Sequence, residues 1–123
     1  MKKILMLDDN PDFVEVIKTR LEANNYEVIT ASSGKDFFRK INDDKPDVVL
    51  VDILMPDING YQVCEGLKKQ KGTADIPVIL LTGKELEHKG IVDRCLKLGV
   101  EAFLLKSADA QELIATIENV LKK

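Results

Sequence analysis

The sequence has no tryptophan, a single histidine and only two cysteines among its 123 residues. Cys64 and Cys95 lie far apart without a CxxC spacing, so no disulfide framework is present and a reducing, cytoplasmic location is expected. Both fall within helical patterns, where a free cysteine usually behaves as a small buried hydrophobe. His88 has no partner at a metal-ligand spacing, and its charged neighbours indicate an exposed surface side chain.

Long apolar runs and a strong charge of one sign are also missing. The N-terminal apolar stretch covers only residues 4–7 before it meets Asp8, which excludes a signal peptide and membrane insertion there. The 18 basic and 21 acidic residues leave a net charge of −3, which gives no support to direct nucleic-acid binding. The basic run 68–71 is interpreted as the favourable end of a helix. Length and composition indicate one globular domain over residues 1–123.

Five short apolar segments alternate with five amphipathic ones. Val48 to Val51 form an apolar run without alternation, which is typical of a strand buried on both faces of a parallel sheet. Helix signals separate the segments, such as Pro11 behind a capping residue, Asn10 or Asp9, and Gly99 behind an apolar periodic stretch. This alternation predicts βαβ units and a three-layer α/β domain. The strand order expected for it is the flavodoxin-like 2-1-3-4-5, in which the switch point lies between the first and third strands. The expected strands are 4–7, 26–31, 48–52, 77–81 and 102–105.

Polar residues follow the ends of four of these strands. Because the carboxyl ends of parallel strands share one edge of the sheet, the side chains of these residues should converge there; they are Asp8 and Asp9, Asp52, Thr82 and Lys106. Three carboxylates would repel one another unless a cation joined them, and oxygen ligands with open positions suit Mg²⁺. Lys106 and Thr82 can both hold phosphoryl oxygens. The set indicates phosphoryl transfer to a carboxylate.

Other residues of the pattern lie close to these positions in the sequence. Met55-Pro56 and Gly60 follow Asp52, Gly83 follows Thr82, and Phe103 lies three residues before Lys106. Together these positions resemble the receiver domain of bacterial response regulators, and the resemblance covers the whole chain. It implies that Asp52 is the phosphoacceptor and takes its phosphoryl group from a histidine on a sensor kinase or a phosphotransfer protein.

The resemblance also implies a ligand set and a switch. Asp9 would bind Mg²⁺ directly and Asp8 through water, while Asp52 and the backbone carbonyl of Leu54 complete the protein's share; Mn²⁺ can substitute. Lys106 would pair with the phosphoryl group, Thr82 would swing toward it, and Phe103 occupies the aromatic switch position. The surface of the fourth helix, fifth strand and fifth helix would then contact a downstream protein. The expected chemistry is self-phosphorylation and auto-dephosphorylation, with no separate substrate.

One position departs from the family pattern. Proline usually follows the lysine, commonly through a cis bond, but here the residue is Ser107. A cis bond before a residue other than proline costs about 2.5–4 kcal/mol, so the Lys106–Ser107 peptide is expected to be trans.

Three other functions are weighed against the leading one. An aspartyl-phosphate phosphohydrolase would need an acidic residue two positions after Asp52, where Leu54 stands. A flavin-binding electron carrier would need a Ser-, Thr- or Gly-rich phosphate loop in place of residues 8–11. A degenerate receiver would bind a partner without being phosphorylated, and only the replacement of the usual proline by Ser107 favours this function. The sequence runs to residues 121–123 directly after the last expected helix, and both a stand-alone receiver and a fragment of a longer regulator or hybrid kinase stay open.

Overall fold

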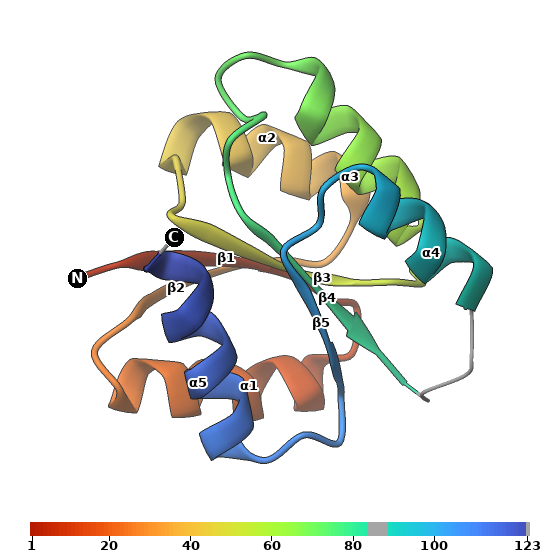
Figure 1. Cartoon of the computed structure of the whole chain (residues 1–123). Helices are drawn as coiled ribbons and strands as arrows, with labels where there is room; N and C mark the ends of the chain where they lie inside the picture. The colour runs from red at the N-terminus through yellow and green to blue at the C-terminus, as the bar shows by residue number, and fades with distance from the viewer. Residues whose placement is uncertain (84–88, 123) are drawn as a thin grey trace.

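Residues 1–83 and 89–122 are described by a computed structural model, in which five strands alternate with five helices (Figure 1). The elements are β1 Lys3–Leu7, α1 Pro11–Ala23, β2 Glu27–Ala31, α2 Gly34–Asp44, β3 Val48–Asp52, α3 Gly60–Lys69, β4 Val78–Thr82, α4 Lys89–Lys97, β5 Ala102–Leu105 and α5 Ala110–Leu121. The expected elements are all present, with bounds that differ by a few residues. The prediction for His88 lies outside the described residues.

All strand pairs are parallel, and the order across the sheet is β2-β1-β3-β4-β5. Helices α1 and α5 cover one face of the sheet, while α2, α3 and α4 cover the other (Figure 1). The predicted flavodoxin-like, three-layer α/β fold is therefore confirmed. The register pairs Leu7 with Val51 and Asp52 with Leu81, so the carboxyl ends of β1, β3 and β4 lie at the same edge.

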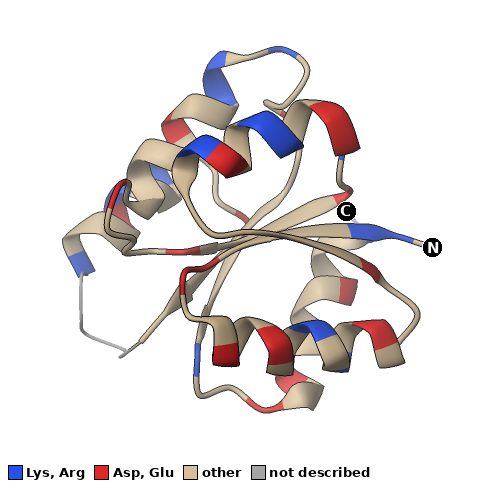
Figure 2. Ribbon diagram, turned by 180° about the vertical axis from the view of Figure 1, so that it is seen from behind, with Lys and Arg blue, Asp and Glu red and all other residues tan. Residues whose placement is uncertain are grey.

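Two apolar layers fill the space between the sheet and its helices. Val49 and Val51 of β3 belong to the layer beneath α2, α3 and α4, whereas Val48 and Leu50 belong to the layer beneath α1 and α5. Because both faces of β3 are covered, every one of its positions is buried, which explains the apolar run in the sequence. Charged residues lie mostly in the helices, the loops and the strand ends, as the reverse view shows (Figure 2).

The structure settles several details of the helices that the sequence leaves open. Asn10, not Asp9, caps α1, and its side chain accepts hydrogen bonds from the backbone N–H groups of residues 12 and 13. Phe38, Ile114 and Leu121 are only partly buried, because α2 and α5 expose part of their apolar faces. Phe38 instead packs across α3 at Gly66, where a Cβ atom would lie only 2.7 Å from the ring. Within the described part of the chain, every helix is too short or too polar to cross a membrane.

Candidate functional site

The carboxylate of Asp8 is fixed by the turn between β1 and α1. Its backbone N–H donates to the carbonyl of Ala31, 3.2 Å away, which continues the β1–β2 ladder by one residue. Its Oδ1 accepts a 2.9 Å hydrogen bond from the backbone N–H of Asn10, the residue that caps α1. The Asp8 residue is only 2% exposed, whereas its neighbour Asp9 is exposed. The chain thus turns into α1 with one carboxylate buried in the sheet edge and the next facing solvent.

Asp52 is the last residue of β3 and is 5% exposed. The loop that follows it is closed by backbone hydrogen bonds, from the N–H of Met55 to the carbonyl of Ile58 at 3.0 Å and from that of Gly60 to Ile53 at 2.7 Å. A Cβ at Gly60 would lie 3.2 Å from the Cα of Ile53, so this position favours glycine. The closed loop leaves the Asp52 carboxylate at the sheet edge. The backbone N–H of Leu54 lies 3.4 Å from its Oδ1.

A second attachment of this loop was not foreseen from the sequence. The Oδ2 of Asp57 accepts a 2.9 Å hydrogen bond from the backbone N–H of Gly34, the first residue of α2. Gly34 is buried, and a Cβ there would lie 2.8 Å from the Cγ2 of Ile58. Carboxylates bind favourably at helix N-termini, so Asp57 ties the loop after Asp52 to α2. Its place after Met55-Pro56 carried no signal of this contact.

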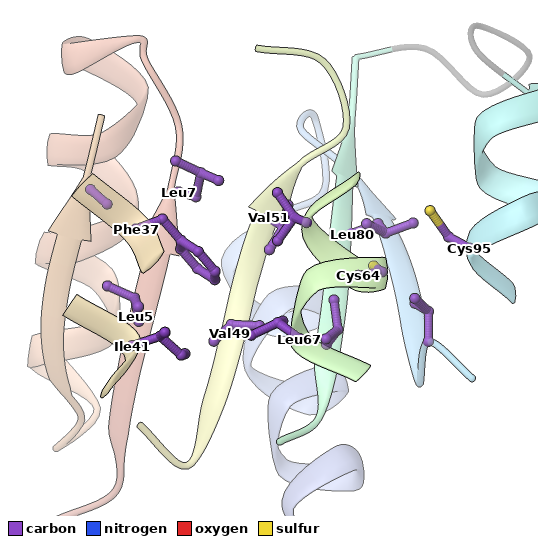
Figure 3. Close-up of a cluster of buried hydrophobic side chains, with 14 of the residues drawn as sticks. Leu5, Leu7, Phe37, Ile41, Val49, Val51, Cys64, Leu67, Leu80 and Cys95 are labelled. Carbon is purple, nitrogen blue, oxygen red and sulfur yellow. The ribbon is translucent and has the colours of Figure 1, made fainter. Parts of the chain in front are cut away.

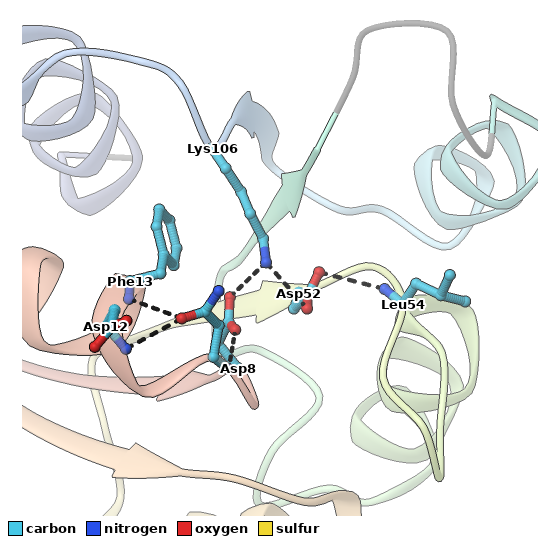
Figure 4. A network of polar contacts seen from close by, with 7 residues as sticks. Asp8, Asp12, Phe13, Asp52, Leu54 and Lys106 are labelled. Atoms are coloured by element: carbon cyan, nitrogen blue, oxygen red, sulfur yellow. Dashed lines mark hydrogen bonds and ion pairs between the residues drawn. The ribbon is translucent and has the colours of Figure 1, made fainter.

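Lys106 reaches from the end of β5 into the space between the two buried carboxylates (Figure 4). Its Nζ lies 2.8 Å from Oδ2 of Asp8 and 3.2 Å from Oδ2 of Asp52. The backbone N–H of Lys106 donates to the carbonyl of Thr82 at 2.7 Å, which fixes the start of the side chain beside β4. The Lys106–Ser107 peptide bond is trans as expected, since no cis bond occurs among the described residues.

The buried charges perturb one another. Burial raises the pKa of Asp52 above its ordinary value, as does the negative charge of Asp8, while Lys106 and the nearby peptide N–H offset part of this rise. Burial alone would lower the pKa of Lys106, but the two carboxylates outweigh it and raise that pKa. The Lys106 ammonium therefore stays charged. The negative charge of Asp52 is only partly compensated by it, so further positive charge nearby would stabilise the ionised carboxylate.

The donor set fits a hard divalent cation. Asp8, Asp9 and Asp52 each offer a carboxylate oxygen, and these oxygens lie within 4.8 Å of one another. The buried Oδ2 of Asp8 has an ion pair with Lys106 but no hydrogen-bond partner among residues 1–83 and 89–122. Three carboxylates against a single ammonium leave excess negative charge, and Mg²⁺ favours such oxygen ligands.

The remaining predicted site residues lie around this cluster. Thr82 is buried at the end of β4, next to the start of Lys106. The side chain of Leu54 faces solvent in the loop after Asp52. Phe103 lies apart from the acidic cluster, on β5, and is 49% exposed. The structure thus brings Asp8, Asp9, Asp52 and Lys106 together, places Thr82 beside them, and separates Phe103 from them.

Comparison with known proteins gives one consistent family. The family model of the response regulator receiver domain matches residues 4–118. The response regulator SaeR of Staphylococcus aureus (strain USA300) is 37% identical over 123 residues, which cover 100% of this chain and 52% of that protein. The alkaline phosphatase synthesis transcriptional regulatory protein PhoP of Bacillus subtilis (strain 168) is 33% identical over 122 residues, 99% of this chain and 49% of that protein.

A solved structure agrees with these relatives. The receiver domain of the sensor histidine kinase PA1611 from Pseudomonas aeruginosa PAO1 superposes with a TM-score of 0.89 at 25% identity. The match covers 99% of this chain and 98% of that one, and that structure has a magnesium ion coordinated in its active site cleft. The present chain spans about half the length of the curated relatives it matches.

Proposed function

Because the chain belongs to the response regulator receiver domain family of two-component signalling, we propose that Asp52 accepts a phosphoryl group from a partner histidine kinase or phosphotransfer protein. The observation that carries this proposal is the position of Asp52: a buried carboxylate at the end of β3, 3.2 Å from the Lys106 ammonium and beside two further carboxylates. A structural aspartate would not need this surrounding, since each buried charge in it costs desolvation free energy.

Magnesium is the cofactor that the donor set favours. Asp9, Asp52 and the backbone carbonyl of Leu54 would hold Mg²⁺ directly and Asp8 through water, and Mn²⁺ can replace it. When bound, the ion supplies positive charge that neutralises phosphoryl oxygens. The buried Oδ2 of Asp8, which has an ion pair with Lys106 but no hydrogen-bond partner among the described residues, supports this assignment, as does the magnesium ion coordinated in the PA1611 receiver domain.

The transfer itself is a displacement at phosphorus. A carboxylate oxygen of Asp52 forms the new P–O bond as the P–N bond of the donor phosphohistidine breaks. The electron pair of the broken bond goes to the imidazole nitrogen, which takes up a proton. Lys106 holds a phosphoryl oxygen by its charge, and the hydroxyl of Thr82 donates to another.

Phosphorylation then switches a protein-binding surface. Thr82 turns toward the phosphoryl group and Phe103 changes its exposure, so the face formed by α4, β5 and α5 is presented differently to a downstream protein. The half-exposed Phe103 and the exposed Leu96 of α4 support this part, since both give this face apolar contacts for a partner. The chain acts on no separate substrate, and we place the exchange in the cytoplasm, where the two free thiols are stable.

The test is phosphorylation by a small donor. Purified protein is incubated with Mg²⁺ and acetyl phosphate, and we expect intact mass spectrometry to show one added phosphoryl group. Asp52→Asn should show none, while Asp93→Asn, which changes an exposed aspartate of α4, should react like the wild type. A wild-type protein that stays unmodified, or an Asp52→Asn variant that labels equally, would overturn the proposal. The switch is tested separately with a beryllium–fluoride complex, which should move Thr82 and Phe103.

A further inference from the structure

The two cysteines, thirty-one positions apart in the sequence, belong to one apolar layer of the structure. Cys64 lies on α3 and Cys95 on the neighbouring α4, and both are 0% exposed free thiols. Figure 3 shows both side chains beside Leu80 of β4, in the space between the two helices. The pairing has no part in the proposed phosphoryl transfer, because the acidic cluster lies at the strand ends.

The two thiols perturb each other. Interaction with the Cys95 thiol, together with burial, raises the pKa of the Cys64 thiol. Interaction with the Cys64 thiol lowers the pKa of the Cys95 thiol, which burial opposes and the positive charge of Arg94 favours. Cys95 is therefore the more acidic of the two thiols and the better source of a thiolate, the nucleophilic form of cysteine.

The surrounding contacts keep the two helices in register at this point. The guanidinium of Arg94 lies 3.9 Å from the centroid of the Tyr61 ring, which comes from the first turn of α3. Val92 and Cys95 are the buried residues of α4, and the partly buried Ile91 packs against the same apolar layer. The two thiols thus lie in one packed layer, on two neighbouring helices that contact each other across it.

We propose that Cys64 and Cys95 form an intramolecular disulfide between α3 and α4 when the protein meets a hydroperoxide, and that thiol reductants reverse it. The Cys95 thiolate attacks the peroxide oxygen, giving a sulfenic acid while the O–O bond breaks and the departing oxygen takes up a proton. The sulfur of Cys64 then attacks the Cys95 sulfur, and the hydroxyl group leaves as water with the Cys64 proton. Two thiols lose two electrons and two hydrogens, and the peroxide is reduced.

Burial sets the conditions under which this bond forms. Both sulfurs are inaccessible in the closed state, so the peroxide reaches Cys95 only when α4 opens locally. The free energy of such a local opening is smaller than that of global unfolding. The bond is then a transient oxidised state of a protein that is reduced at rest, as is usual for disulfides in a reducing compartment. Its effect is to join α4 covalently to α3, whatever the acidic cluster does.

The experiment uses the whole chain, reduced and then treated with hydrogen peroxide in native buffer. We expect a monomer that has lost two hydrogen atoms by intact mass, a peptide pair linked through Cys64 and Cys95 after digestion, and recovery of both thiols with dithiothreitol. Cys64→Ser should instead accumulate a sulfenic acid at Cys95, which a cyclic 1,3-dione traps. Cys95→Ser should be oxidised more slowly than Cys64→Ser.

Three results would overturn the proposal. They are a chain that keeps two free thiols, a disulfide-linked dimer in place of the monomer, and an oxidation rate that rises in step with the unfolded fraction in dilute urea. Faster oxidation of Cys95→Ser than of Cys64→Ser would overturn the order of the two steps. Because acetyl phosphate labelling is measured on the reduced protein, failure of this proposal and failure of the phosphoacceptor proposal are distinguishable.

Discussion

The acidic cluster and the thiol pair are two buried sets of titratable side chains with opposite physical character. Asp8, Asp52 and Lys106 carry charge into the sheet edge, where burial is costly and the groups compensate one another incompletely. Cys64 and Cys95 are neutral in the reduced state, and they fill an apolar layer at no comparable cost. In our proposals, the first set binds a cation because of its excess negative charge, and the second set reacts with an oxidant.

The difference shows how a fold can hold reactive groups in two ways. A site that takes up and releases a charged group is not the most stable local arrangement, because its buried charges are incompletely compensated while the group is absent. A reactive pair hidden in a packed layer contributes to stability until it reacts. Substitutions in the two sets should therefore change the free energy of unfolding differently, and we expect four effects, from the largest to the smallest.

Replacing Lys106 with alanine should have the largest effect. It leaves the buried carboxylates of Asp8 and Asp52 without their shared ammonium, and breaking such a buried ion pair costs about 3 kcal/mol. Urea unfolding at pH 7 in the presence of a chelator measures this loss. Lys97→Ala, at an exposed position of α4, should change stability by less than about 0.5 kcal/mol. Equal effects of the two substitutions would show that Lys106 does not stabilise the buried carboxylates of Asp8 and Asp52.

Asp52→Asn should stabilise the metal-free protein, by roughly 1–2 kcal/mol at pH 7, because it removes a buried charge that Lys106 compensates only in part. Burial and the charge of Asp8 raise the folded-state pKa of Asp52, so ionisation of Asp52 opposes folding. The wild type's deficit should therefore vanish below the ordinary pKa of aspartic acid and be complete above the raised value.

Added Mg²⁺ supplies the matching test for this variant. A cation that binds only the folded state stabilises it, so the ion should raise the unfolding midpoint of the wild type more than that of Asp52→Asn. Unfolding curves across pH, with chelator and with Mg²⁺, measure both effects. A variant less stable than the wild type under chelation would contradict the reading of Asp52 as a strained charge.

Cys64→Ala and Cys95→Ala should each cost about 1 kcal/mol, because each leaves a small cavity in a packed layer. The two losses should not add, since both thiols belong to one packed layer, and the double variant should lose less than the sum. Chelator and Mg²⁺ should leave these losses unchanged, in contrast to those at the acidic cluster. Additive losses, or losses that depend on Mg²⁺, would remove the distinction between the two sets.

Asp9→Asn should have the smallest effect in chelator, below about 0.5 kcal/mol, because this carboxylate is exposed and its charge is solvated. The same variant should lose most of the stabilisation that Mg²⁺ gives to the wild type, since Asp9 would be a direct ligand. Thermal unfolding with and without Mg²⁺ gives both values. A variant that keeps the full response to Mg²⁺ would remove Asp9 from the ligand set.

The acidic cluster could be predicted from the sequence because strand ends are visible in it. Each parallel strand points its carboxyl end to the same edge, so Asp8, Asp52 and Lys106 converge whatever the details of packing. Sequence could not show that Lys106 bridges the two carboxylates, nor that Asp57 binds the N-terminus of α2. Both contacts depend on loop conformation and on rotamers, which neighbouring residues in space decide.

The thiol pair could not be predicted in the same way. The periodicity of Val63, Cys64 and Leu67 identifies a buried face of α3, and that of Val92 and Cys95 a buried face of α4. It does not say which residue of one helix meets which residue of the other. That depends on how far each helix is shifted along and rotated about its axis when it packs.

The order of apolar and polar segments in the sequence thus determined the α/β fold, the parallel sheet and the edge at which the charged residues gather. These follow from burial of apolar surface and from the chirality of βαβ connections, which act on the pattern and not on individual side-chain positions. Only the tertiary structure decided that two cysteines far apart in sequence become neighbours, and that Lys106 lies between Asp8 and Asp52. Close packing at the scale of single atoms sets such pairings, and a sequence pattern specifies a face without its partner.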